Sequence, residues 1–387
     1  MAEESRKKLS AKKVRHINRK RLIRLIAVLI LAAAALVLLI RLVSRRNFRS
    51  ADLISDSEQS GGSAVSYLHL GERILRYSQN GAAMLEGSGK ELWNLSYVYA
   101  KPKAKLQGSY GAIADIGGTG ACIFGRDGIT GQITTNSPIL NLAVSEKGTT
   151  VLILEEGTKS IIQFYDRTGK PLDISATLEM AISGFPLDAA LSPDGTGLIV
   201  SAGAYLSGVL GTQIVFYNFA VGKGEMNRLV GYFTYENVLF PEIRYMGGEA
   251  AVAVGDDRLV FFDLSTENKP KVGQEVKFET EISAADAGEA HAAVVRSADS
   301  GTGLVLEVFD RTGRKCFAAD LTEYPRYLEE GRNYVLMTSA SGVRLWDYKG
   351  RLRFTGLAEQ DPQTVFAVDR NTLIQPSGGH LFRWRLR

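Results

Sequence analysis

Tyr165-Asp166-Arg167-Thr168-Gly169-Lys170 is a stretch that this chain repeats. In each copy an apolar strand end leads into a polar turn that closes with glycine. The close copies are Phe309-Asp310-Arg311-Thr312-Gly313-Arg314 and Trp346-Asp347-Tyr348-Lys349-Gly350-Arg351, and shorter or looser ones lie at 85–90 and 124–128. Glycine supplies the positive φ of a tight hairpin, and aspartate can accept hydrogen bonds from the turn's N–H groups. The repeat therefore predicts a series of similar β-hairpins.

A second repeat sets the size of the unit. Residues 142–149 align with 189–196, and their serines, Ser145 and Ser192, are 47 residues apart. An inner strand, a tight turn, a second strand and the glycine hairpin make four strands, and four-stranded units of about 40–45 residues are propeller blades. The hairpins mark eight units, near 64–96, 105–135, 139–175, 187–232, 240–277, 280–320, 323–355 and 362–387.

The sequence thus predicts an all-β protein, a β-propeller of eight blades. The last unit lacks a fourth strand, and residues around Asp52–Ser55 could supply it, which would close the ring and remove an exposed edge. Seven blades is the alternative, because the first and last units could share one sheet.

A transmembrane helix is predicted before the propeller. Residues 25–40 carry no charge, and 22–43 would form a helix of about 33 Å, enough to cross the hydrocarbon core. Ten Lys and Arg precede residues 25–40 and four follow them closely, which favours a cytoplasmic N-terminus. We expect a basic cytoplasmic tail (1–21), a transmembrane helix (22–43), a linker (44–63) and an extracytoplasmic propeller (64–387), held at the plasma membrane by a single pass.

Two other interpretations of this region are less favoured. A cleaved signal peptide needs small residues after the apolar run, whereas Ala32–Ala35 lie in its middle, so an uncleaved anchor is favoured. The basic tail could bind anionic lipid or nucleic acid, but membrane topology alone accounts for it. Residues 51–387 carry a net charge of −8, which argues against a nucleic-acid partner.

Short motifs resemble those of two propeller classes. Ser88-Gly89-Lys90-Glu91-Leu92-Trp93 resembles the docking signature of quinoprotein-type propellers, and Leu191-Ser192-Pro193-Asp194-Gly195 looks like the turn of WD40-like propellers. The layout is similar to an uncharacterised family of single-pass, membrane-anchored β-propeller proteins of Gram-positive bacteria. Only the first unit keeps the docking tryptophan, and Leu172, Cys316 and Leu352 lie near that place in later units.

No catalytic, cofactor-binding or metal-binding residues are identified, and no cofactor is expected. His69, His291 and His380 stand alone in strand-like contexts, and Cys122 and Cys316 are expected to be buried free thiols. The resemblance to quinoproteins does not extend to a calcium site or paired cysteines. Whether the protein is an enzyme is left open, with a non-enzymatic role favoured.

One connection is a candidate partner-binding site. Residues 204–211, between the second and third strands of the fourth unit, are unusually apolar for a loop, and they offer Tyr205, Leu206, Val209 and Leu210. A long hairpin that folds back on its own blade is the alternative. Residues 298–303 are expected on the same face.

The favoured function is a non-enzymatic protein-binding or envelope-assembly scaffold, with a protein or cell-envelope component as its partner. The first alternative is a ligand-binding or enzymatic propeller (a lyase, glycan-active or quinoprotein-like protein) with its site at the central channel mouth. That alternative predicts polar and acidic side chains clustered in the channel. The second alternative is a sensor that signals through the basic tail.

Overall fold

The computed structural model describes residues 26–33, 47–59, 65–220, 228–266, 268–357 and 361–387. The chain divides into two compact units, Met1–Asn47 and Phe48–Arg387. In the first unit, residues 26–33 are helical. No described helix has both the length and the apolar character needed to cross a membrane. Most of the predicted span, 22–43, lies outside the described residues.

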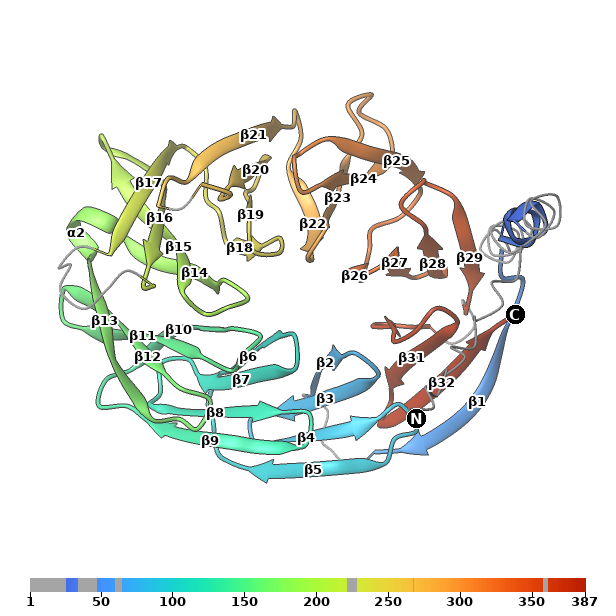
Figure 1. Cartoon of the computed structure of the whole chain (residues 1–387), viewed down its shortest axis with the longest axis horizontal. Coiled ribbons are helices and arrows are strands. Elements are labelled where there is room, and N and C mark those ends of the chain that lie inside the picture. Colours follow the sequence, from blue (N-terminus) through green and yellow to red (C-terminus); the bar gives the residue numbers. More distant parts are fainter. Residues whose placement is uncertain (1–25, 34–46, 60–64, 221–227, 267, 358–360) are drawn as a thin grey trace, which may run out of the picture. The chain divides into compact units, whose positions relative to one another are not determined.

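The second unit is an eight-bladed β-propeller, as the repeats predict (Figure 1). Each blade is an antiparallel sheet of four strands, and the first strand of each lies nearest the centre of the ring. Blade 1 contains β2 (Ser66–Leu70), β3 (Arg73–Ser78), β4 (Gly81–Glu86) and β5 (Glu91–Ser96). Blade 2 contains β6 (Pro102–Gln107), β7 (Tyr110–Asp115), β8 (Gly120–Gly125) and β9 (Gly128–Thr134). Blade 3 contains β10 (Ile139–Val144), β11 (Thr150–Glu156), β12 (Lys159–Tyr165) and β13 (Pro171–Glu179).

A four-residue helix, α2 (Met180–Ser183), joins blades 3 and 4. Blade 4 contains β14 (Phe185–Leu191), β15 (Gly197–Leu206), β16 (Val209–Asn218) and β17 (Leu229–Glu236). Blade 5 contains β18 (Glu242–Tyr245), β19 (Ala250–Val254), β20 (Arg258–Asp263) and β21 (Lys271–Lys277). Blade 6 contains β22 (Ile282–Ala287), β23 (His291–Ser297), β24 (Leu304–Asp310) and β25 (Lys315–Leu321). Blade 7 contains β26 (Tyr327–Gly331), β27 (Tyr334–Ser339), β28 (Gly342–Trp346) and β29 (Leu352–Gly356).

Blade 8 combines the two ends of the propeller. Its first three strands are β30 (Phe366–Ala367), β31 (Thr372–Ser377) and β32 (His380–Leu386), and its outer strand is β1 (Ala51–Glu58). β1 pairs with β32 from Ala51↔Leu386 to Glu58↔His380. The prediction that residues around Asp52–Ser55 complete the last blade is confirmed. The stretch predicted as a linker, 44–63, therefore contains a strand of the propeller.

The core is a ring of eight interfaces rather than one central mass. Each of the eight apolar clusters joins two neighbouring blades, including blades 8 and 1. Successive residues of a strand point to opposite faces, so Val151 and Ile153 pack toward blade 4 while Leu152 packs toward blade 2. Both faces of each blade are buried in this way, which explains the uninterrupted apolar runs in the sequence.

The repeated aspartate turns have the predicted geometry. Asp166 Oδ1 accepts hydrogen bonds from the N–H groups of Thr168 (2.8 Å) and Lys170 (3.1 Å), and Gly169 has a φ of 80°. The turns at Asp310 and Asp347 repeat these contacts. The carboxylate thus satisfies backbone donors that a tight turn would otherwise leave open.

The absence of a side chain at the turn glycine also allows the preceding blade to pack closely against the turn. A Cβ placed on Gly313 would lie 2.9 Å from Cβ of Gln274 in blade 5, and one placed on Gly350 would lie 3.0 Å from Cβ of Phe317 in blade 6. In the same way, Gly89 lies against Ser57 of β1, where blade 8 meets blade 1. Glycine is required at these positions by the positive φ and by the close approach of the preceding blade.

Strand register shows which residues of blades 6 and 7 occupy the position of the docking tryptophan, Trp93. Trp93 pairs with Met84, and the equivalent pairs are Phe317 with Val308 and Phe354 with Leu345. Cys316 and Leu352, which the sequence suggested for this place, lie one and two residues before it. Aromatic docking therefore continues in blades 6 and 7 with phenylalanine instead of tryptophan.

Candidate functional site

The predicted binding loop is a β-hairpin that extends beyond its own blade. β15 and β16 pair as far as Leu206↔Val209, and Ser207 (φ 52°) and Gly208 (φ 93°) form the turn. The neighbouring strands stop earlier, because β14 pairs with β15 only up to Gly203 and β17 pairs with β16 only from Gly211. Two-residue turns with positive φ match the twist of paired strands. The hairpin therefore projects from the blade as a two-stranded ribbon.

The four predicted residues divide between the two faces of this ribbon. Tyr205 and Leu210 form one cross-strand pair and are exposed, Tyr205 to 80%. Leu206 and Val209 form the next pair on the other face and are half-buried. The structure thus brings all four together but makes only the first pair fully available to a partner.

Two further apolar side chains lie beside the hairpin. Phe185 pairs with Gly203, two residues before Tyr205, so both side chains leave the same face of the sheet. α2 packs against β15, and its Ile182 is 72% exposed. We refer to Ile182, Phe185, Tyr205 and Leu210 as the apolar patch. It lies on the face of the ring that carries the connections between blades and the turns between second and third strands.

Charged side chains gather on the inner strands, around the ring's centre. We call the following set the inner-strand charge cluster: Lys103, Lys105, Asp188, Glu242, Arg244, Asp286, Glu329 and Glu330. They come from blades 2, 4, 5, 6 and 7. The ligand-binding alternative predicts such a cluster in the channel.

The two lysines of the cluster, Lys103 and Lys105, lie beside the carboxylate of Asp188. Lys105 Nζ lies 2.6 Å from Asp188 Oδ1 and donates to the carbonyl of Ala189, while Asp188 Oδ2 accepts the N–H of Ile243 at 3.2 Å. Lys103 Nζ is 3.6 Å from the same carboxylate and is more exposed. These contacts tie the inner strands of blades 2, 4 and 5 together. The charge of Asp188 is therefore well compensated.

Burial and pairing shift the pKa values of this pair. Burial lowers the pKa of Lys105 to about 8, although the Asp188 charge opposes the change. Burial would raise the pKa of Asp188, but the two lysines outweigh it and hold that pKa below its usual range. Lys105 thus begins to lose its charge within about one pH unit of neutrality.

The acidic part is formed by blades 6 and 7. Asp286 Oδ2 accepts the N–H of Glu330 at 2.6 Å. Burial, helped by the carboxylates of Glu242 and Glu329, raises the pKa of Asp286 to about 7, although the hydrogen bond from the Glu330 N–H and the charge of Arg244 oppose this change. Near neutral pH this carboxyl group is therefore present in both protonation states.

Glu329 forms a contact across the closing blade. Its carboxylate accepts a hydrogen bond from Tyr334 Oη at 2.5 Å and lies 3.3 Å from Nε2 of His69 in blade 1. The inner strand of blade 8 has only two residues, so blade 1 can reach blade 7 beside Phe366. Burial lowers the pKa of His69, but Glu329 outweighs it and the pKa is raised overall.

The other histidines and the cysteines also have structural surroundings. His291 stacks on Tyr348 with ring centroids 3.5 Å apart, and His380 Nδ1 lies 2.7 Å from Asp56 of β1. Cys122 is a buried free thiol as predicted, whereas Cys316 is only half-buried because it lies on an outer strand. Within the described ranges, no group of three or more His, Cys, Asp or Glu could hold a metal ion.

Sequence analysis missed the inner-strand charge cluster. The available signal was a charged residue inside the first strand of a unit, such as Lys105 or Asp188, between apolar neighbours. An inner strand has one edge open to the channel, which gives such residues access to solvent. Shifted pKa values of the kind found for Lys105 and Asp286 are enriched at functional sites, although structural ion pairs produce them too.

Comparison with known proteins identifies a family and the fold. The family model described as "Family of unknown function (DUF5711)" matches residues 44–378. No curated protein matches the sequence significantly. Among solved structures, BamB from Moraxella catarrhalis is 14% identical with a TM-score of 0.52, covering 87% of this chain and 100% of its own. Apo AztD from Citrobacter koseri is 14% identical with a TM-score of 0.52, and the match covers 76% of this chain and 85% of AztD. The Dos1 propeller is 11% identical with a TM-score of 0.51, and the match covers 88% of this chain and 94% of the Dos1 chain.

Proposed function

The chain belongs to the DUF5711 family, whose function is unknown, and we propose that this member is a membrane-anchored, extracytoplasmic scaffold. In this proposal the propeller carries no enzymatic activity and binds a protein or another component of the cell envelope. The observation that supports it most strongly is the apolar patch. Its four large apolar side chains come from α2, β14 and the β15–β16 hairpin, and all four are exposed. Exposed groups of large apolar side chains are typical of protein-interaction sites.

The anchor is proposed from the sequence. Residues 22–43 are long and apolar enough for one span, and the excess of Lys and Arg before it favours a cytoplasmic N-terminus. β1 begins at Ala51, eight residues after this segment. The resemblance to membrane-anchored propellers of Gram-positive bacteria supports the same arrangement.

A charge-insertion experiment tests the role of the patch. We expect Tyr205→Glu with Leu210→Lys to remove a partner that co-purifies with the full-length chain. Both side chains are exposed, and residues 204–210 form strand pairs only within their own hairpin, although the Leu210 carbonyl also accepts the N–H of Asn237 at 3.0 Å. The thermal midpoint should therefore stay close to that of the unchanged protein. A partner set that is unaffected by these substitutions would show that the hairpin is not the contact.

The matched control is on the opposite face of the ring. Arg167 and Thr168 are exposed in the turn between β12 and β13, at the other end of the strands. Arg167→Glu with Thr168→Lys introduces the same charges and should leave the partner bound. Loss of the partner in both variants would point to a general effect of charge rather than to the patch.

A second candidate function is favoured by the inner-strand charge cluster. Lys103 and Arg244 are each 39% exposed although they lie on inner strands, so solvent reaches them from the channel. A small polar molecule could bind there. If so, Lys103→Met with Arg244→Met should abolish its binding in a ligand screen and leave the hairpin's partner in place. Equal binding by the variant would remove this candidate.

A further inference from the structure

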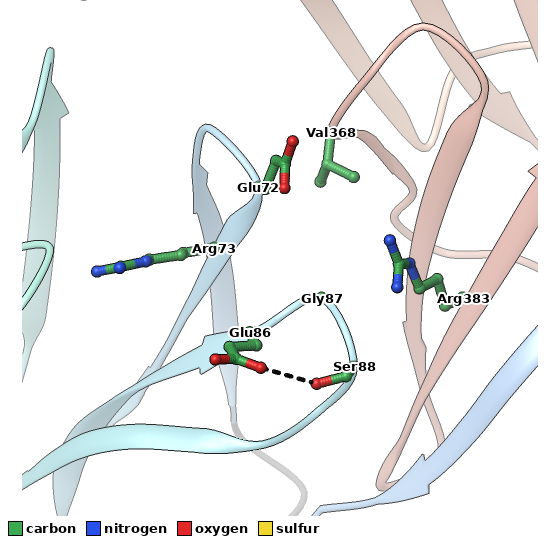
Figure 2. A pocket seen from close by; sticks show the side chains of 7 residues that line it. All are labelled: Glu72, Arg73, Glu86, Gly87, Ser88, Val368 and Arg383. Carbon is green, nitrogen blue, oxygen red and sulfur yellow. Dashed lines mark hydrogen bonds between the residues drawn. The ribbon is translucent and has the colours of Figure 1, made fainter.

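A cavity lies where the first and last blades meet. It has a volume of about 280 Å³ and is lined by Glu72, Arg73, Glu86, Gly87, Ser88, Val368 and Arg383. Figure 2 shows Val368 and Arg383 on the blade 8 side and the glutamates and Ser88 on the blade 1 side. Because blade 8 is completed by β1, the walls of this cavity come together only when the ring is closed.

Arg383 is the unusual residue of this cavity. It lies on β32, and its Nε is buried without a hydrogen-bond partner among the described residues. Gly87 borders this side chain, and a Cβ at Gly87 would lie 4.0 Å from Nε of Arg383 and 2.9 Å from Ile374. A buried guanidinium donor is nearly always paired with an acceptor in proteins. The cavity therefore offers a cationic donor that lacks an anionic oxygen.

The opposite wall offers a carboxylate. The carboxylate of Glu72 is exposed and forms no hydrogen bond or ion pair among the described residues. Glu86 is the cross-strand partner of Arg73, so both side chains leave the face of the sheet turned toward blade 2, and the Glu86 carboxylate accepts the Ser88 hydroxyl at 3.2 Å. Arg73 does not compensate Glu72, since Figure 2 shows it extending away, where it reaches the Arg126 carbonyl and Asp127. Glu72 and Arg383 thus lie on opposite walls of the cavity, which gives it separate sites for a positive and a negative group.

We propose that this cavity binds a small zwitterion of the α-amino acid class. The carboxylate of the ligand would accept hydrogen bonds from Arg383, and its ammonium group would lie beside Glu72. Charge-assisted hydrogen bonds of this type are about twice as strong as neutral ones. A volume of about 280 Å³ is at the lower end of ligand pockets, which favours a free amino acid over a larger molecule. Such a ligand would contact both blades at the point of ring closure.

Calorimetric titration of the full-length chain in detergent tests this proposal. The probes are glycine, L-alanine and L-glutamate as zwitterions, with acetate and methylamine as analogues that carry only one of the two charges. We expect saturable binding of at least one zwitterion and much weaker binding of both analogues. No saturable binding of any zwitterion, or equal binding of acetate or methylamine, would overturn the proposal.

Variants of the two walls separate their roles. Arg383→Met should weaken binding about tenfold or more, as expected for loss of a hydrogen bond to a charged group. Arg385→Met is the matched control, because it removes the same charge from the same strand at an exposed position that does not line the cavity. It should bind normally. Equal weakening in both variants would contradict the assigned site.

Glu72 needs a separate variant, because it could turn inward and pair with Arg383. Glu72→Gln should weaken zwitterion binding and leave the thermal midpoint of the unliganded protein unchanged. If this variant binds zwitterions normally, or if it lowers the unliganded midpoint as much as Arg383→Met does, the carboxylate serves an internal ion pair and the proposal fails. These results do not depend on the apolar patch or its partner.

Discussion

At the scale of single residues, the turn glycine does two things in this fold. Its positive φ closes the hairpin between the third and fourth strands, and its missing side chain admits the preceding blade. The aspartate three residues earlier caps the turn by accepting two backbone N–H groups. These requirements are local, which is why the same six-residue pattern recurs in the sequence and predicts the hairpins correctly.

Replacing Gly313 by alanine separates the two contributions of the glycine. A Cβ there would lie 2.8 Å from the buried ring of Phe261, whereas a Cβ on Gly301 in the same blade meets nothing within 4 Å. Both glycines have positive φ, so both substitutions carry the backbone cost of about 1 kcal/mol. We expect Gly313→Ala to lower the free energy of unfolding by about 1–3 kcal/mol more than Gly301→Ala, as overpacking does. Equal losses in urea denaturation would contradict the docking role.

At the scale of elements, β1 closes the ring. It completes blade 8 by pairing with β32, and its Ser57 lies against Gly89 of blade 1. The sequence predicts this strand because the last unit lacks an outer strand and an exposed edge is unfavourable. The hairpin of residues 204–211 was also identified correctly as an apolar connection. Its extension as a ribbon was not predicted, since only strand pairing shows where the neighbouring strands stop.

A disulfide between β1 and β32 tests the closure. Asp52 and Arg385 face each other across the two strands and are partly or fully exposed, so cysteines at both positions can approach without disturbing the core. Oxidation should link them and raise the thermal midpoint, because the bond would close a loop of more than 300 residues, worth about 6 kcal/mol in the chain-entropy model. Each single variant serves as the control. Failure of the double variant to form this bond would argue against β1 as the outer strand of blade 8.

At the scale of the whole molecule, long-range contacts decide what the sequence could not predict. Fold and blade number follow from repeated local turns. The inner-strand charge cluster instead depends on partners such as Lys105 and Asp188, which are 83 residues apart and two blades distant. The cavity with Arg383 forms only from the two ends of the propeller. Neither site has a local motif, and both arise from the way the ring closes.

The contact between His69 and Glu329 makes the stability of the ring depend on pH. The folded-state pKa of His69 is raised, so its contribution is fully present below its ordinary pKa of 6.5 and is lost as pH rises through the folded value. We expect His69→Gln to lower the free energy of unfolding by about 1 kcal/mol at pH 5.5 and by less at pH 9. His380→Gln is the control, because that histidine is more exposed and pairs with Asp56 within blade 8. If His69→Gln lowers the free energy of unfolding equally at both pH values, a charged contact between His69 of blade 1 and Glu329 of blade 7 is contradicted.

The proposed scaffold is tested most directly by site-specific photo-crosslinking in intact cells. A photoreactive amino acid would replace Tyr205 in the apolar patch or, as a control, exposed Arg167 on the opposite face of the ring. The proposal predicts a discrete protein adduct from position 205 that is absent from position 167 and is accessible to protease added outside the cells. No adduct from position 205, the same adducts from both positions, or an adduct protected from external protease would contradict it.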